Sequence, residues 1–164
     1  MDENTIMISL DTSTADSGVA VWSNGKLIEY FDLQKPKGAA PGNEWMTEKL
    51  FTLFVELKPH IVVLEEVKVF RNAKTTTELI TLIGRIQGCC IVNNIFCYCL
   101  APTEWRKQIV SGEEKVPRKR EDAKLWAIEK VKSLYDIKEA NDNICEAILI
   151  GQAYINLFGQ RVSE

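Results

Sequence analysis

Acidic side chains stand where three separate apolar segments begin or end, and this arrangement could bind divalent cations. Asp11 and Glu65 each follow a mostly apolar run, whereas Asp142 and Glu146 open an apolar segment late in the sequence. Hard cations such as Mg²⁺ prefer carboxylate oxygens as ligands. Four such side chains could hold two Mg²⁺ ions, which together activate a water molecule and stabilise the leaving oxygen when a phosphodiester is cut.

Asp11 by itself is open to two interpretations. It is followed by small polar residues and by a second apolar run that reaches Trp22. In one interpretation, Asp11 and these polar residues only form the turn of a β-hairpin. In the other, Asp11 is a metal ligand at the edge of a sheet. The other acidic segments favour the second interpretation, because carboxylates that face one another without a cation repel and raise one another's pKa.

The acidic residues of the last segment share one side of a predicted helix. Asp142 lies four residues before Glu146, and Asn143 lies three residues before it. Both spacings place two side chains on the same face of a helix. Either Asp142 or Asn143 could therefore point to the same place as Glu146.

The apolar patterning predicts an α/β protein that would position these acids. Asn24 and Gly25 between two apolar runs are a strong hairpin signal, so three antiparallel strands open the chain. Further strands alternate with helices, which predicts a mixed five-stranded sheet, three antiparallel strands and then parallel strands, flanked by helices. The first two expected strands end at Asp11 and Trp22, and the other three span 26–33, 60–67 and 95–100. The expected helices span 43–58, 75–92, 102–111, about Pro117 to Leu134, and 142–158.

Size and composition indicate one globular domain inside the cell. The chain has 164 residues, and 46% hydrophobic with 26% charged residues is typical of a folded soluble protein. No apolar run is long enough to cross a bilayer, and the N-terminus is acidic where a secretory signal would be basic. The five cysteines lack zinc-type spacing and are interpreted as small buried hydrophobic residues in a reducing compartment.

Basic residues are concentrated in one segment although the net charge is −3. Lys115, Arg118, Lys119 and Arg120 lie within six positions, and Lys107 and Lys124 flank them. A local basic patch on an acidic protein is suited to phosphate contacts on one face. The alternative is an ordinary solvated loop and helix start.

Four segments, in the same order, resemble motifs of the RuvC-type Holliday junction resolvases of the ribonuclease H-like superfamily. The resemblance covers nearly the whole chain. In the second motif it places the catalytic acid on Glu65 rather than Glu66. The resembling segments are Leu10–Ser13 with Ser17–Ala20, Ile61–Val67, the Pro-x-Glu-Trp-Arg-Lys signature Pro102–Lys107, and the terminal acidic helix from Asp142 to Leu149.

The resemblance implies a single ribonuclease H-like nuclease domain over residues 1–164. Its implied activity is that of a Mg²⁺-dependent structure-selective endodeoxyribonuclease of DNA recombination and repair, which cuts four-way and other branched DNA. Two Mg²⁺ ions per site are expected, and Mn²⁺ is expected to substitute. A homodimer is implied because a two-fold junction is cut twice, and helix 75–92 is the candidate interface, with an internal core helix as the alternative. The expected location is the cytoplasm of a bacterial or phage-infected cell, without a membrane partner.

The implied catalytic and metal-binding residues are Asp11, Glu65, Asp142 and Glu146. One position departs from the family pattern, which has acids three residues apart in the last motif. Counting back three from Glu146 gives Asn143, an amide. We favour Asp142 as the ligand, because divalent ions gain much of their affinity from the number of charged ligands. Asn143 remains the alternative through its carbonyl oxygen.

The resemblance also implies a DNA-binding surface. Phe70 matches in type a loop aromatic that can stack on an unpaired base, and an ordinary core aromatic is the alternative. The expected phosphate contacts should give binding a steep salt dependence. They are Arg71, Lys74, Lys107, Lys115, Arg118, Lys119 and Arg120.

Two other functions use the same features. A ribonuclease H acting on RNA–DNA hybrids would need the same sheet and acids, and a non-catalytic junction-binding protein could keep the fold without metal affinity. A nucleotide-binding domain of the actin or sugar-kinase type is disfavoured, because such proteins need two domains and a glycine that the first turn lacks.

Overall fold

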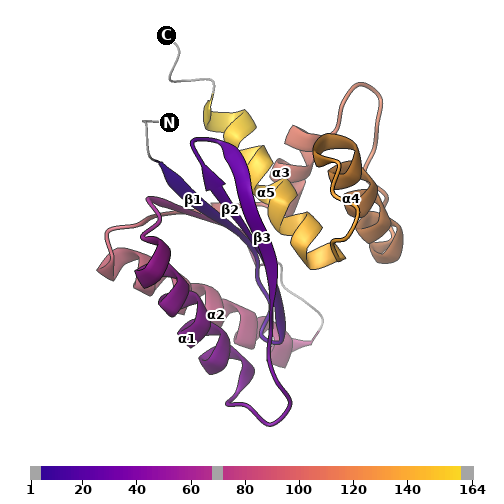
Figure 1. The fold of residues 1–164 in the computed structure, drawn as a ribbon. Helices are drawn as coiled ribbons and strands as arrows, with labels where there is room; N and C mark the ends of the chain where they lie inside the picture. Colours follow the sequence, from indigo (N-terminus) through magenta and orange to yellow (C-terminus); the bar gives the residue numbers. More distant parts are fainter. Residues whose placement is uncertain (1–4, 68–71, 160–164) are drawn as a thin grey trace.

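A computed structural model describes residues 5–67 and 72–159. A five-stranded sheet lies between two layers of helices, with α1 and α2 on one face and α3, α4 and α5 on the other side (Figure 1). The strands are β1 (Ile6–Asp11), β2 (Asp16–Ser23), β3 (Lys26–Gln34), β4 (Ile61–Glu65) and β5 (Phe96–Leu100), and the helices are α1 (Gly42–Leu57), α2 (Ala73–Val92), α3 (Pro102–Ile109), α4 (Arg120–Tyr135) and α5 (Asp142–Phe158).

The sheet has the mixed topology that the sequence predicts. Its strand order is β3-β2-β1-β4-β5, in which β1, β2 and β3 pair antiparallel while β4 pairs parallel with both β1 and β5. Asn24 and Gly25 connect β2 to β3 with positive φ angles of 52° and 77°. Two such residues in succession form the tight turn that favours a hairpin. The predicted fold class is therefore confirmed.

Two hydrophobic cores lie on opposite faces of the sheet. Met7 and Val63 belong to the core beneath α3, α4 and α5, whereas Leu10 and Leu64 belong to the core beneath α1 and α2. Because successive side chains of a strand point to opposite faces, the odd-numbered residues of β1 and β4 face α5. This alternation decides to which side the residues at the strand ends point.

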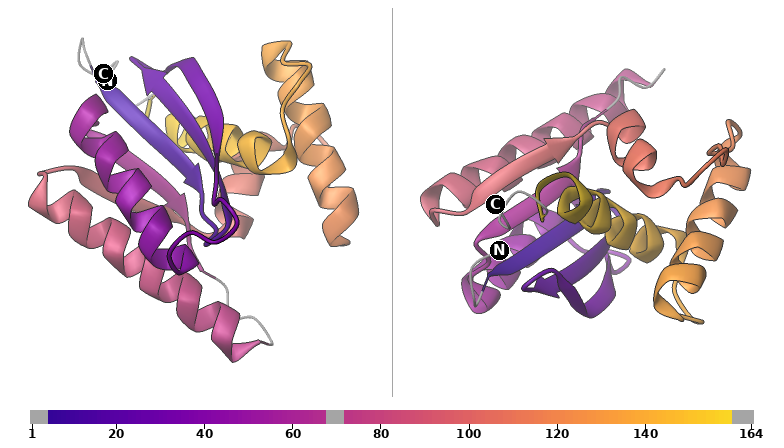
Figure 2. Two further views of the ribbon diagram at one scale, coloured as in Figure 1. Left: turned by 60° about the horizontal axis from the view of Figure 1, so that its bottom comes forward. Right: turned by 90° about the horizontal axis from the view of Figure 1, so that it is seen from above.

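Helix α5 is the central element of its layer and lies between the sheet and α4 (Figure 2). It approaches the sheet so closely that a Cβ atom on Gly151 would stand 2.4 Å from Ser9 Oγ. Ser9 Oγ donates a hydrogen bond of 2.7 Å to the Ala147 carbonyl and accepts one of 2.9 Å from Trp22 Nε1. These buried polar contacts and the glycine fix α5 against β1 and β2.

Some element boundaries differ from the predicted ones. Helix α2 begins at Ala73, two residues before the predicted start, because the Asn72 side chain caps it by accepting from Lys74 N at 3.0 Å. Asn is among the best N-cap residues, whereas the predicted helix began only at Thr75. The strand predicted over 60–67 is shorter, 61–65, and the helix predicted over 102–111 ends at Ile109. The Asn141 side chain caps the start of α5 by accepting from Ile144 N at 2.9 Å.

The cysteines occupy the environment expected of reduced thiols. All five are free, and Cys90 and Cys145 are buried whereas the other three are partly buried. Within residues 5–67 and 72–159, the structure contains no helix long and apolar enough to cross a membrane.

Candidate active site

Asp11 and Glu65 come together because β1 and β4 are parallel neighbours in matched register. Leu10 pairs with Leu64, so the next residue of each strand lies at the same edge of the sheet. Both residues are odd-numbered and face α5. Strand pairing alone therefore places these two carboxylates side by side.

The first turn of α5 brings Asp142 and Glu146 to the same edge. Asp11 pairs with Gly18 of β2, and a Cβ atom on Gly18 would stand only 2.0 Å from the Asn143 carbonyl oxygen. Real Cβ contacts are never that short, so β2 needs glycine at this position. The start of α5 thus lies directly against the sheet beside Asp11.

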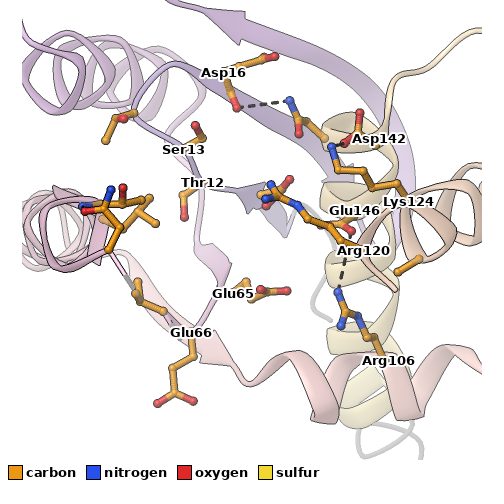
Figure 3. Close-up of a pocket in the computed structure, with 18 of the residues that line it drawn as sticks. Thr12, Ser13, Asp16, Glu65, Glu66, Arg106, Arg120, Lys124, Asp142 and Glu146 are labelled. Carbon is orange, nitrogen blue, oxygen red and sulfur yellow. Dashed lines mark hydrogen bonds and ion pairs between the residues drawn. The ribbon is translucent and has the colours of Figure 1, made fainter. Parts of the chain in front are cut away.

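The predicted carboxylates line one pocket between the sheet, α2, α3, α4 and α5 (Figure 3). Asp11, Glu65, Asp142 and Glu146 all contribute, and so does Asn143. The turn after β1 forms one wall. The opposite wall carries cations from three positions that reach toward the acids, and these are Arg106 from α3 and Arg120 and Lys124 from α4.

The crowding of these acids changes their ionisation. Burial raises the pKa of Asp11 well above its ordinary value, and the charges of Glu146, Glu65 and Asp142 raise it further. Burial and the Glu65 charge raise the pKa of Glu146 to about 6, although Arg106 opposes this. Negative charges placed so close together require compensation by positive charge. The pocket therefore has the electrostatics of a cation-binding site.

Protein donors already contact three of the four carboxylates. Among the described residues, no group of three or more acidic, histidine or cysteine side chains has an arrangement that could hold a metal ion. The contacts are a hydrogen bond of 2.6 Å from Trp105 Nε1 to Glu65 Oε2, an ion pair of 2.6 Å between Lys124 Nζ and Asp142 Oδ2, and a longer ion pair of 4.0 Å between Arg106 Nη2 and Glu146 Oε1.

The donor set fits a hard divalent cation. It consists of carboxylate oxygens, which suit Mg²⁺ and Mn²⁺, and no histidine or cysteine is among the described residues that line the pocket. Asn143 Nδ2 donates to the Asp16 carbonyl at 3.4 Å, whereas the carboxylate of Asp142 meets Lys124. The choice between Asp142 and Asn143 as ligand stays a prediction, and the charge argument still favours Asp142.

The predicted DNA-binding residues separate into three groups. Arg118 and Arg120 line the pocket. Phe70 and Arg71 lie outside the described residues. The others are exposed but are not among the described residues that line the pocket, and these are Lys74, Lys107, Lys115 and Lys119.

Two pocket cations, Arg106 and Lys124, were not predicted as site residues. Arg106 follows the buried Trp105 on α3, and its guanidinium lies 4.9 Å from the centre of that indole ring. The sequence held a signal for it, because Pro102, Trp105 and Ile109 have the spacing of a buried helical stripe. Arg106 borders this stripe, whereas the predicted Lys107 points away into solvent. Lys124 was noted only as a neighbour of the basic segment.

The basic segment between α3 and α4 is attached to the pocket wall through Glu114. Glu114 accepts hydrogen bonds from Trp126 Nε1 at 2.8 Å and from Lys130 Nζ. These donors lower the pKa of Glu114 to about 2. The Trp126 ring lies 6.4 Å from the ring of Trp105, which itself holds Glu65. A chain of contacts thus connects the segment to the carboxylates.

Fold and pocket together define the class: a ribonuclease H-like α/β fold with an acidic pocket where β1 and β4 end. No protein-family model and no curated protein sequence matches the chain. Solved structures of Holliday junction resolvases do share the fold. RuvC from T. thermophilus, in complex with a Holliday junction substrate, superposes with a TM-score of 0.74 at 12% identity, covering 97% of this chain and 96% of that one.

Two further resolvases have the same fold. The yeast mitochondrial Holliday junction resolvase Ydc2 gives a TM-score of 0.69 at 12% identity, covering 96% of this chain and 80% of that one. The fowlpox virus Holliday junction resolvase gives 0.61 at 18% identity, covering 94% and 100%. The chain thus has the RuvC-type fold over nearly its full length.

Proposed function

We propose that this chain is a divalent-metal-dependent endodeoxyribonuclease, a single nuclease domain that resolves four-way and other branched DNA. The observation that carries the proposal is the convergence of Asp11, Glu65, Asp142 and Glu146 in one pocket. These acids come from three separate elements of a fold that the chain shares with Holliday junction resolvases. The proposed reaction is hydrolysis of one phosphodiester in each of two opposed strands.

In this proposal the four carboxylates hold two Mg²⁺ ions, with Mn²⁺ as a substitute. Bound there, the ions would supply an activated water and stabilise the leaving oxygen. Trp105 orients the Glu65 carboxylate through its indole N–H. Arg118 and Arg120 contact phosphates beside the pocket, and the more distant lysines extend the basic surface along the DNA.

We further propose that the enzyme acts as a homodimer in the cytoplasm of a bacterial or phage-infected cell. Helix α2 is the proposed interface. Ile80, Ile91 and Val92 support this proposal, because they are apolar side chains of α2 with 55%, 76% and 78% of their surface exposed. A two-fold protein would place two pockets symmetrically for paired cuts.

Cleavage of a synthetic four-way junction tests the proposal. With Mg²⁺, paired nicks in opposed strands are expected, and EDTA should abolish them. Asp11→Asn and Glu65→Gln should abolish cutting while sparing junction binding, because the acids position metal whereas the basic residues supply affinity. Tight junction binding without nicks, even in Mn²⁺, would instead support a non-catalytic binding protein. Preferred cutting of an RNA–DNA hybrid would support a ribonuclease H.

A second pair of variants separates the two candidate ligands in α5. If Asp142 completes the metal site, Asp142→Asn should abolish cutting as Asp11→Asn does, whereas Asn143→Ala should keep at least part of the parental rate. The reverse result would assign the ligand to the amide of Asn143. Calorimetric titration of both variants with Mn²⁺ compares their metal affinities without DNA.

A further inference from the structure

Lys124 makes the shortest charged contact among the ion pairs of the described pocket residues. Its Nζ lies 2.6 Å from Asp142 Oδ2, and the two side chains are only 34% and 26% exposed. Lys124 and Asp142 thus form a close, partly shielded ion pair. One of the four candidate ligands is therefore already neutralised by a cation of the protein.

The position of Lys124 follows from helix α4. Lys124 lies four residues after Arg120 and directly after Ala123, which is buried against the core. The side chain extends from this helix toward the start of α5, where it meets Asp142 (Figure 3). Its charge also opposes part of the rise in the pKa of Asp11 and of Glu146. Lys124 thus compensates part of the charge of the whole acidic group, not of Asp142 alone.

A divalent cation would perform the same compensation in the same place. An ammonium at 2.6 Å from a carboxylate oxygen occupies that oxygen, and its charge repels any metal ion bound nearby.

We propose that Lys124 is a resident counter-cation that competes with the divalent metal for Asp142. Without metal, Lys124 neutralises Asp142 and keeps the start of α5 from repelling the strand-end acids. When metal binds, Asp142 exchanges the ammonium for the ion. This inference rests on the metal site of the proposed function, and it makes Lys124 a positioning residue that sets the metal concentration the site requires.

Direct measurement of Mn²⁺ binding tests the proposal. Titration calorimetry of the full chain without DNA, at about 0.15 M salt, compares the parental protein with Lys124→Gln. Loss of the competing charge should tighten Mn²⁺ binding roughly three- to tenfold. Lys124→Arg keeps the charge and should bind Mn²⁺ like the parental protein.

Lys132→Gln is the matched control. Lys132 is an exposed residue of the same helix and is not among the described residues that line the pocket. Among the described residues, Lys132 forms no ion pair with any of the four acids, so removing the same charge there should change Mn²⁺ affinity less than Lys124→Gln does. Equal affinities of Lys124→Gln and Lys132→Gln, or weaker binding by Lys124→Gln, would overturn the proposal.

A stability measurement gives an independent reading. Without metal, Lys124→Gln should melt at a lower temperature than Lys132→Gln, because the acids lose their counter-charge. Mn²⁺ should raise its melting temperature by more than it raises that of the control. Equal metal-induced shifts in both variants would contradict the inference.

Asp11→Asn separates this inference from the proposed function. If Asp11→Asn binds Mn²⁺ as well as the parental protein, the metal site itself is wrong, and the inference fails with it. If Asp11→Asn loses Mn²⁺ binding while Lys124→Gln leaves it unchanged, the metal site stands and only the competition by Lys124 is refuted.

Discussion

Replacing Gly18 by alanine should displace the helix that carries two of the four acids. The new Cβ would stand 2.0 Å from the Asn143 carbonyl oxygen and 2.3 Å from its carbon, where ordinary contacts begin at 3.4 Å. The neighbouring atoms are backbone and cannot rotate away. The first turn of α5 must therefore move away from β2 by about 1.4 Å, which is the difference between the ordinary contact distance of 3.4 Å and the 2.0 Å that separates the new Cβ from the Asn143 oxygen.

Two effects of known size follow from this displacement. Overpacking of a tight contact destabilises a protein by about 1–3 kcal/mol. A misplacement of catalytic groups by about 1 Å can lower a rate by roughly 100-fold. Gly18→Ala should therefore lower the free energy of unfolding in urea by about 1–3 kcal/mol. Single-turnover cleavage of a four-way junction in Mg²⁺ should slow by about two orders of magnitude, while junction binding in EDTA should persist.

Gly84→Ala provides the control for the added methyl group. Apart from its own stretch of α2, no described atom lies within 4 Å of a Cβ built at Gly84. Alanine in a helix is favoured over glycine by about 1 kcal/mol, so this variant should be at least as stable as the parental protein. Light scattering should check the oligomeric state of both variants, because Gly84 lies on α2, the proposed dimer interface. Parental stability and cutting by Gly18→Ala would refute the claim that this close approach positions the acids.

Three further predictions concern the pocket and its wall. The pKa of Glu146 is raised from its ordinary 4.5 to about 6, so the folded state binds the proton more tightly; unfolding free energy in EDTA should fall by roughly 2 kcal/mol as pH rises through this window. Glu146→Gln should make this fall smaller, and an unchanged pH profile would contradict the prediction. The fall that remains comes from Asp11, whose pKa is also raised. Trp105→Phe removes the 2.6 Å hydrogen bond to Glu65 and should cost about 1–3 kcal/mol in urea unfolding, with cutting reduced more than junction binding. Glu114→Gln should weaken junction binding across a salt series by loosening the basic segment, at a stability cost of about 1 kcal/mol or less; unchanged binding would show that the segment does not need Glu114.

The strands and the meeting of Asp11 with Glu65 could be predicted because they depend on local patterns. Alternating or continuous apolar runs mark the strands, and each of these two acids directly follows such a run. Parallel neighbouring strands end at one edge, so the acids meet once β1 and β4 are neighbours. That pairing joins distant segments, and the family resemblance implied it. Glu146 follows similarly from helical spacing within one segment. Their roles as metal ligands remain predictions.

The pocket cations could not be predicted in the same way. Lys124 and Asp142 lie in different helices, and their contact depends on how α4 packs against α5. No local pattern reports that packing. The omission of Arg106 was a smaller gap, since the buried stripe of α3 was visible in the sequence and would have indicated Arg106 as well. The DNA contact of Lys107 stays a prediction.

The close approach of α5 to β2 could not be predicted from the sequence either. Gly18 lies within the motif segment Ser17–Ala20, but glycine is needed there because of the Asn143 backbone, which comes from the far end of the chain. Likewise, Asn72 was overlooked as a helix cap because three threonines followed it. In both cases the deciding factor was a backbone atom whose position depends on tertiary structure.

The hydrogen bonds of Ser9 to Trp22 and to the Ala147 carbonyl hold α5 in a fixed position against the sheet. A slide of α5 by one helical turn would move Glu146 by about 5.4 Å and would force a larger residue than Gly151 against Ser9 Oγ. The sheet and α5 must therefore behave as one rigid body. In the proposed function, an exchange of partners when metal or DNA binds would therefore involve the side chains of α3 and α4 that contact the acids, Arg106 and Lys124.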